Sequence, residues 1–209
     1  RNELERHGIG VKVDLPGVGT NLQDRYEVSV VYRMRDDWNF MNGAEFRRDD
    51  RIFDQWQKTA QGVYATNGGM FAILKKSRQE RILPDLFCMS LLARFEGYFP
   101  GYSKLISSHR NYLSWIILKA HTENNAGTVT LQSADPRDPP RIDFRYFDEG
   151  SDREEKDLDA VVDGVKFVRS ISSDLRKEGL IAEEHLPGDR AQDDEQLRDF
   201  VRYNAWGHH

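Results

Sequence analysis

Strand-forming segments recur along the first two thirds of the chain. Residues 27–34 are rich in β-branched and aromatic side chains, and residues 112–120 form a nearly continuous apolar run that is typical of a central strand. Shorter segments of similar character predict strands at residues 68–74, 85–92 and 141–144. The chain is therefore expected to build a β-sheet before its longest helix.

One further strand is expected directly after a turn. Residues 128–131 alternate between polar and apolar side chains, and the turn-forming residues Glu123–Gly127 separate them from the long apolar run. Two strands joined by a short turn pair antiparallel. We therefore expect a hairpin between Tyr112–Ala120 and Thr128–Gln132.

Helices are predicted mainly toward the end of the chain. Between Asp152 and Ser172 the apolar residues fall on one stripe of a helix, at Leu158, Val161, Val162, Val165, Val168 and Ile171. Ser151 or Asp152 is the expected N-cap of this helix. Further helices are predicted over residues 193–203 and 45–59. Strands followed by long helices predict an α+β fold, with an antiparallel β-sheet backed by α-helices.

Composition and charge narrow the possible functions. The 209 residues are 38% hydrophobic and 11% aromatic, which is enough for a sizeable core and too apolar for a disordered chain. A formal net charge of −5, with both signs interspersed, argues against nucleic-acid binding. The sequence has no run of 18 apolar residues and no signal-peptide pattern, so we expect a soluble chain without a membrane span.

The glycine-rich segments do not have the context of a nucleotide site. Residues 8–10 and 17–19 each contain G-x-G, but neither stands between a strand and a helix with a third glycine at the right position. We interpret both as tight turns. Residues 66–69 are also expected to form a turn, although such small residues let a ligand approach the backbone closely.

Metal chemistry is not favoured either. His7, His109, His121 and His185 are scattered and lack acidic or cysteine partners at metal-ligand spacing. The single cysteine, Cys88, excludes an intrachain disulfide and a cysteine zinc site. From residue chemistry alone, the chain is an α+β domain without a complete active site.

Two long segments resemble a known family. Residues 8–24 read G-I-G-V-K-V-D-L-P-G-V-G-T-N-L-Q-D, and residues 127–147 contain G-T-V-T-L-Q-S, D-P and P-R-I-D-F-R-Y-F before the long predicted helix. Both segments, in this order, resemble glucose–methanol–choline (GMC) oxidoreductases. The family usually has His after N-L-Q-D, where this chain has Arg25.

The resemblance implies which part of such an enzyme this is. Residues 1–25 would be the tail of the FAD-binding domain and linker, and residues 26–209 the substrate-binding domain, truncated at its C-terminal end and lacking the Rossmann-type flavin domain. The parent enzyme would use FAD to oxidise an alcohol CH–OH group, with the parent's own flavin domain and a small alcohol as partners. We expect this fragment alone to bind no FAD and to be inactive.

The resemblance also implies a catalytic histidine shortly after the last helix. His209 matches the family position best, and His208 is the alternative; a tag remnant or an aromatic-rich tail would explain the pair without catalysis. An imidazole that titrates near neutrality can take the hydroxyl proton of an alcohol. A non-catalytic binding module and a hydroxynitrile lyase of the same fold remain open alternatives.

Overall fold

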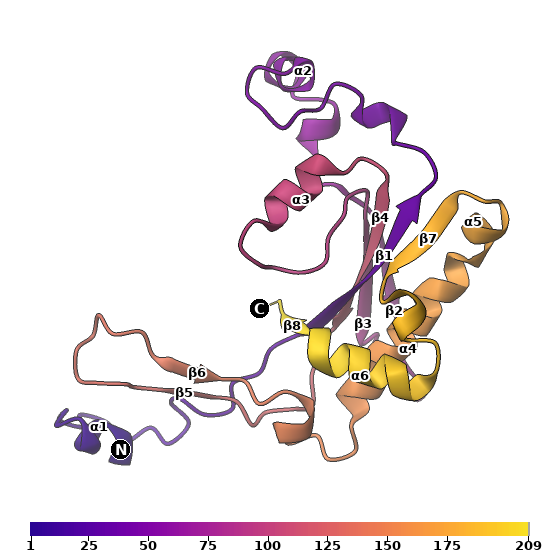
Figure 1. Cartoon of the computed structure of the whole chain (residues 1–209). Coiled ribbons are helices and arrows are strands. Elements are labelled where there is room, and N and C mark those ends of the chain that lie inside the picture. The colour runs from indigo at the N-terminus through magenta and orange to yellow at the C-terminus, as the bar shows by residue number, and fades with distance from the viewer. Residues whose placement is uncertain (209) are drawn as a thin grey trace.

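A twisted antiparallel sheet forms the body of the molecule (Figure 1). The computed structural model describes residues 1–208. Within them a six-stranded sheet has the order β2-β3-β4-β1-β7, and the short strand β8 pairs with the start of β1. Its strands are β1 (Tyr26–Met34), β2 (Gly69–Lys75), β3 (Leu86–Leu91), β4 (Tyr112–Lys119), β7 (Ile181–Leu186) and β8 (Trp206–Gly207). The predicted α+β class with an antiparallel sheet is confirmed.

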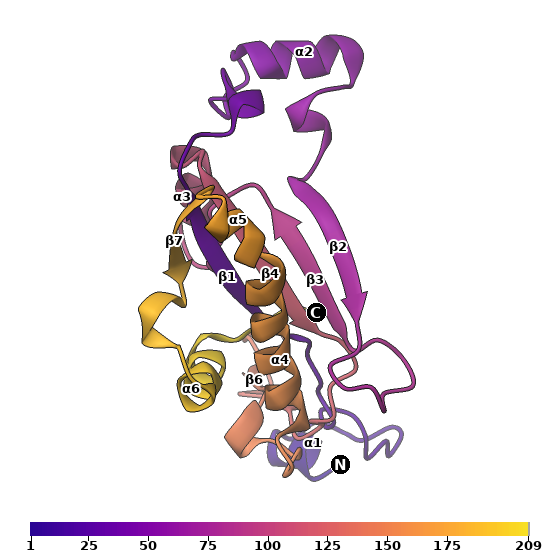
Figure 2. The same ribbon diagram turned by 90° about the vertical axis from the view of Figure 1, so that its right-hand side faces the viewer.

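One long helix covers one face of this sheet (Figure 2). This helix, α4 (Lys156–Ile171), packs so closely that a Cβ added at Gly164 would lie 2.5 Å from Ile117 Cγ2. The glycine therefore allows the close approach of helix and sheet. The other helices are α1 (Asn2–Arg6), α2 (Arg51–Thr59), α3 (Tyr102–Ser108), α5 (Ser173–Lys177) and α6 (Asp194–Asn204).

Side chains alternate between two different faces of the sheet. The helix face buries apolar residues against α4, among them Val28, Val30, Tyr32, Leu113, Trp115, Ile117, Leu86 and Cys88. The C-terminal residues lie on the opposite side, which we call the tail face (Figure 1). From the strand register, the tail face carries Glu27, Ser29, Val31 and Arg33 of β1, Tyr112, Ser114, Ile116 and Leu118 of β4, Phe87, Met89 and Leu91 of β3, and Ala72 and Leu74 of β2.

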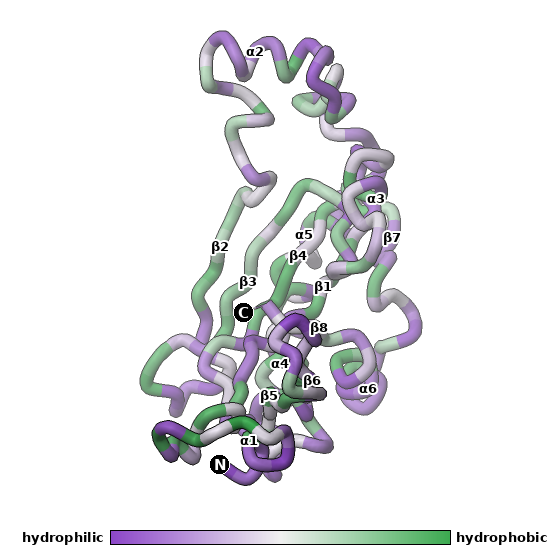
Figure 3. Tube along the Cα trace, turned by 90° about the vertical axis from the view of Figure 1, so that its left-hand side faces the viewer, coloured by the Kyte–Doolittle hydropathy of each residue, from purple (hydrophilic) through white to green (hydrophobic). Residues whose placement is uncertain are grey.

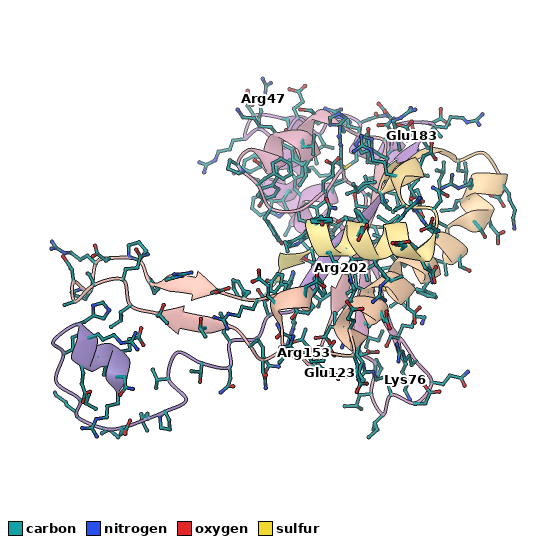
Figure 4. All side chains as sticks on the ribbon, turned by 60° about the horizontal axis from the view of Figure 1, so that its bottom comes forward. Arg47, Lys76, Glu123, Arg153, Glu183 and Arg202 are labelled. Carbon is teal, nitrogen blue, oxygen red and sulfur yellow. The ribbon has the colours of Figure 1, made fainter. Side chains whose placement is uncertain are left out.

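The predicted hairpin between Tyr112–Ala120 and Thr128–Gln132 is wrong. Strand β4 pairs with β1 and β3, whereas β5 (Thr128–Thr130) pairs with β6 (Arg141–Asp143) in a separate two-stranded sheet. These two strands form an arm that extends away from the body, with α1 beside it (Figure 1). Glu123 marks the base of this arm (Figure 4).

Side-chain hydrogen bonds turn the chain out of the sheet at the base of the arm. The Asp157 carboxylate accepts the backbone N–H groups of Glu123 (2.8 Å) and Asn124 (3.1 Å). The Asn124 amide donates to Tyr26 Oη (2.7 Å). The predicted turn is thus tied to the start of α4, and His121 changes the chain direction through a left-handed conformation (φ +54°). Turn composition could not reveal these distant partners.

The start of the longest helix also differs from the prediction. The helix predicted from Asp152 begins at Lys156 because the Asp152 carboxylate instead accepts the backbone N–H of Asp157 (2.7 Å). The expected N-cap Ser151 bonds through its hydroxyl to the Asn125 side chain (2.8 Å). By contrast, Asp193 caps α6 by accepting the Gln196 N–H (2.8 Å).

Residues 35–68 form a long excursion between β1 and β2 at one end of the sheet (Figures 1 and 2). The helix predicted over residues 45–59 is confined to α2, because Asp50 caps it by accepting the Phe53 N–H (2.7 Å). Asp50 also accepts from Tyr64 Oη (2.5 Å), which ties both ends of the excursion together. A small apolar cluster of its own stabilises the excursion: Met41, Ala44 and Ile52.

The elements that were not predicted include α3, α5, the edge strand β7 and the short strand β8. Strand β7 was missed because Glu183 and Glu184 interrupt the pattern of apolar and β-branched residues from which strands are predicted. Glu184 is held by Arg169 of α4 (2.5 Å), and Glu183 by Arg33 of β1 (2.7 Å). Within residues 1–208, no helix combines the length and apolarity that crossing a membrane requires.

Candidate active site

The C-terminal residues return to the first strand of the sheet. Trp206 pairs with Glu27, and Gly207 pairs with Tyr26, as β8 lies antiparallel along the start of β1. His208, one of the two predicted catalytic residues, therefore lies at the tail face. His209, the other one, lies outside the described residues.

A buried carboxylate holds the His208 ring. Glu27 Oε2 accepts a hydrogen bond from Trp206 Nε1 (2.7 Å) and contacts His208 Nδ1 (2.9 Å). Because an indole N–H is only a donor, Glu27 Oε2 must be an acceptor, and an ionised Glu27 then also accepts a hydrogen bond from His208 Nδ1–H. In the neutral ring the proton then lies on Nδ1, and Nε2 is the unprotonated nitrogen. Glu27 is 2% exposed, so these donors compensate the burial of its charge.

A second carboxylate fixes the backbone of the same turn. Asp24 accepts the backbone N–H groups of His208 (3.1 Å) and Arg25 (2.7 Å), and the hydroxyl of Tyr146 (3.0 Å). Burial raises the pKa of the Tyr146 phenol, and its hydrogen bond to the Asp24 carboxylate raises it further. Tyr146 therefore stays protonated and remains a donor to Asp24.

Gly207 is required by this packing. A Cβ at this position would lie 1.8 Å from Asp24 Oδ2 and 2.7 Å from Tyr146 Oη. Neither group can move away without breaking the contacts that hold the turn. The segment from Trp206 to His208 is thus clamped from both sides, and we call it the C-terminal turn.

Aromatic packing covers the other side of Trp206. Its ring meets that of Phe95 edge to face at 6.0 Å, and a Cβ at Gly97 would lie 3.1 Å from Trp206 Cε3. The loop that carries Phe95 is held to the sheet by Ser114, whose hydroxyl accepts the Phe95 N–H (3.0 Å) and donates to the Ala93 carbonyl (2.7 Å). The tail face thus contributes polar groups that position this loop.

Two other histidines also come together, although they are far apart in the sequence. Arg94 lies 3.3 Å from His109 Nε2 and 2.7 Å from His185 Nε2, over the ring of Tyr112. Glu96 lies 2.5 Å from the Arg94 side chain. Across residues 1–208 there is no group of three or more histidine, cysteine or acidic side chains that could hold a metal ion.

The glycine-rich segments take part in chain packing. Gly19 lies against the arm, where an added Cβ would be 2.5 Å from the Val129 carbonyl oxygen. Gly8 follows the single short turn of α1 and adopts a left-handed conformation (φ +68°). Neither segment links a strand to a helix N-terminus, the arrangement that holds a dinucleotide pyrophosphate.

Residue patterns identified only part of this arrangement. Sequence reasoning singled out His208 and His209 but missed Glu27, Asp24 and Trp206 as the residues that hold His208. Asp24 closes the N-L-Q-D motif, which was the one available signal. Glu27 reads as an ordinary strand residue, because only the antiparallel return of β8 brings it beside His208.

Comparisons with known proteins show what the chain is similar to. Residues 123–209 match the family model described as GMC oxidoreductase. Over 204 residues the chain is 27% identical to the oxygen-dependent choline dehydrogenases of Staphylococcus aureus strains JH9 and Newman, which covers 95% of this chain and 33% of theirs. The chain thus spans about a third of the length of these curated relatives.

Solved structures share the fold at lower identity. Formate oxidase from Aspergillus oryzae RIB40 aligns with a TM-score of 0.74 and 20% identity, over 99% of this chain and 39% of that one. A fungal aryl-alcohol oxidase aligns with a TM-score of 0.67 and 20% identity, over 98% of this chain and 40% of that one. The chain is therefore similar to GMC oxidoreductases along most of its length, and residues 123–209 are the part that matches the family model.

Proposed function

We propose that this chain is the substrate-binding part of an FAD-dependent oxidoreductase that oxidises an alcohol CH–OH group. The observation that carries the proposal is the C-terminal turn, where buried Glu27 holds the His208 ring on the tail face (2.9 Å). The names of the relatives support the class of reaction, since they include a choline dehydrogenase and an aryl-alcohol oxidase.

The described residues fit the ring of a flavin but not its dinucleotide part. Among residues 1–208, no helix packs on the β2–β3 part of the tail face, where Ala72 and Leu74 are exposed, so a flat ring carried by another domain can approach from that side. The glycine-rich turns lack the pyrophosphate-binding arrangement. When bound, FAD supplies the acceptor for the hydride that leaves the alcohol carbon.

The residues of this chain would supply the base. The family motif favours His209, and His208 is the candidate whose ring is described. With Nδ1–H donated to Glu27, Nε2 of His208 can accept the hydroxyl proton of the alcohol. The Glu27 carboxylate then stabilises the positive charge on the ring, while Asp24 and Trp206 keep the turn in place.

We also propose a division of the chain near Arg25, with residues 1–25 belonging to the flavin-domain side and residues 26–209 to the substrate-binding domain. The division rests on the family resemblance. In this chain the first segment packs on the arm: Leu22 forms an isolated bridge with Gly127, and the Leu131 N–H is 2.5 Å from Glu3 Oε1. Asp24, at the end of the segment, meets the C-terminal turn.

The chain alone should then purify colourless and oxidise no alcohol. Flavin absorbance after gel filtration, measured against protein concentration, tests this expectation. A stoichiometric yellow preparation would show that the chain holds the dinucleotide itself, and the proposed division of labour would be wrong.

Anaerobic stopped-flow measurement of flavin reduction tests the role of the histidines in the FAD-loaded protein that contains this chain. His209→Ala should slow reduction by roughly 10²-fold or more with the flavin still bound, since general-base assistance contributes about 10²–10⁴-fold. His121→Asn is the matched control, because Asn tolerates the left-handed conformation of that exposed residue. An unchanged rate in His209→Ala, with a large loss in His208→Ala, would assign the base to His208. Unchanged rates in both variants would reject the proposed mechanism.

A further inference from the structure

Beyond His208, the tail face continues onto two strands whose side chains there are uncharged. The residues are Phe87, Met89 and Leu91 of β3, all half-buried, and Ala72 and Leu74 of β2, both exposed. Figure 3 shows both strands coloured hydrophobic near the C-terminus. Together these five side chains form what we call the apolar floor.

The apolar floor leads to a cavity of about 370 Å³ beneath the excursion. Its walls include Phe40, Phe46, Tyr64, Met70, Leu91 and Ile106. Three polar groups of the wall are engaged locally: Tyr64 Oη donates to Asp50 (2.5 Å), the Thr66 hydroxyl donates to the Val63 carbonyl (3.2 Å), and Asn67 Oδ1 accepts the Gly69 N–H (3.2 Å). Burial, and then the hydrogen bond to Asp50, raise the pKa of Tyr64 to about 12, so the phenol is neutral at physiological pH. Such a cavity suits an uncharged, apolar group.

Floor and cavity are continuous. Leu91 belongs to both, and a Cβ at Gly69 would lie 3.6 Å from Met89 Sδ and 4.0 Å from Leu91 Cδ2, so these side chains meet beside that glycine. Phe87 lies on the same rung of the sheet as Glu27. Leu91 is four residues further along β3, which corresponds to roughly 13 Å at about 3.3 Å per residue.

The carboxylates beside the C-terminal turn are not accessible to a cationic ligand. Glu27 is 2% exposed and already receives Trp206 and His208. Asp24 is 9% exposed and already receives Tyr146 and two backbone N–H groups. A positively charged head group would therefore lose its hydration on the apolar floor without gaining an ion pair.

We propose that the apolar floor and the cavity bind the uncharged tail of the substrate. The substrate class is then a neutral alcohol with an elongated aliphatic or aromatic tail, with its hydroxyl at the terminal histidines and its tail directed along β3 under the excursion. This assignment rests on the proposed function, and it separates the chain from relatives named for choline, a cationic alcohol.

Binding of compounds that cannot react tests this assignment separately from turnover. In the FAD-loaded protein, isothermal titration would compare methyl ethers of straight-chain alcohols from ethanol to decanol with the methyl ether of choline. The affinity should rise about threefold per added methylene until the cavity is filled, then level off, because each buried methylene contributes a similar transfer free energy. The choline ether should bind at least about tenfold more weakly than an uncharged ether of equal size.

Two surface variants locate the site. Phe40→Ala removes a cavity wall that is 48% exposed and should weaken binding of the octyl ether about tenfold, with little effect on the ethyl ether. Ile82→Ala, at a side chain that is 91% exposed on the loop between β2 and β3, is the matched control and should change neither. Affinity that is independent of chain length, or equal losses in both variants, would overturn the assignment. If the ethers bind as expected while the alcohols leave the flavin oxidised, the binding site stands and the proposed function fails.

Discussion

The two faces of the sheet are made by the same strands and differ in what they hold. On the helix face, Val28 and Val30 of β1 are fully buried against α4. On the tail face, the alternate residues Glu27 and Ser29 are also buried, but Glu27 is engaged by the C-terminal turn. Burial alone therefore does not distinguish core from site in this domain.

The distinction lies in the type of partner. Buried apolar side chains gain stability from any well-packed neighbour, whereas a buried carboxylate needs specific donors at specific places. Lys119 is another buried charged residue that needs specific partners, although it lies outside the candidate active site. Its ammonium group is fully buried between the carboxylates of Asp85 (3.5 Å) and Asp157 (3.6 Å) and donates to the Ala120 carbonyl (2.9 Å). Lys119 is enclosed by its partners, whereas the His208 side chain keeps 27% of its surface exposed.

The largest effect on stability is expected on the helix face. Trp115→Ala should lower the free energy of unfolding by about 3–5 kcal/mol, because it leaves a large cavity in the core. Trp115→Phe should cost much less, since the buried indole N–H has no hydrogen-bond partner among the described residues. Urea denaturation of both variants provides the measurement. Equal losses in the two variants would show that the indole nitrogen has a partner after all.

The C-terminal turn should be sensitive in activity rather than in stability. Gly207→Ala places a Cβ on the Asp24 carboxylate and must displace His208, so flavin reduction in the FAD-loaded protein should slow by about ten- to a hundredfold. Gly10→Ala is the control, because no atom lies within 4 Å of its added Cβ. Wild-type reduction rates in Gly207→Ala would contradict the clamped turn.

A smaller, pH-dependent effect is expected in the excursion. Burial raises the pKa of the Asp50 carboxyl, but hydrogen bonds from Tyr64 and from three backbone N–H groups outweigh it, so the net pKa lies below its ordinary value. Stability from Asp50 is therefore present above the unfolded pKa of about 4 and is lost as the pH falls through the folded value. The protection factor of the Phe53 amide, which compares its exchange rate with that of an unstructured amide at the same pH, should fall in acid.

Asp50→Ala should show the same low protection of Phe53 already at neutral pH, while β4 amides such as that of Ile117 stay protected. The variant should also weaken binding of the octyl ether, because Phe46 and Tyr64 line the cavity. Protection of Phe53 that is unchanged in the variant would show that Asp50 does not hold the excursion.

Local residue patterns predicted most strands of the sheet but did not predict how the strands are connected. Residues 27–34 and 112–120 were correctly predicted as strands because most of their side chains are β-branched, aromatic or apolar. The hairpin after Lys119 was mispredicted because the Asp157 carboxylate, far along the chain, captures the turn. Strand β7 was missed because its two glutamates are paired with arginines from other elements.

The candidate site was likewise predicted only in part. The family resemblance pointed to His208 and His209, since that motif is carried by consecutive residues. Glu27 could not be found from the sequence, because it is 181 residues from His208 and meets it only through the register of β8 on β1. Residue patterns do not show which distant segments of the chain pair with each other.

The rate of flavin reduction in Glu27→Gln tests most directly whether the tail face carries the chemistry. Gln keeps the size of the side chain but removes the charge that orients and stabilises the His208 ring. In the FAD-loaded protein, anaerobic stopped-flow should show reduction slowed about tenfold or more with little change in KM, and partial recovery in Glu27→Asp. Val161→Ala on the helix face should lower stability by about 1–3 kcal/mol and leave the rate unchanged. A wild-type rate in Glu27→Gln, or a comparable loss of rate in Val161→Ala, would contradict the division of roles between the two faces.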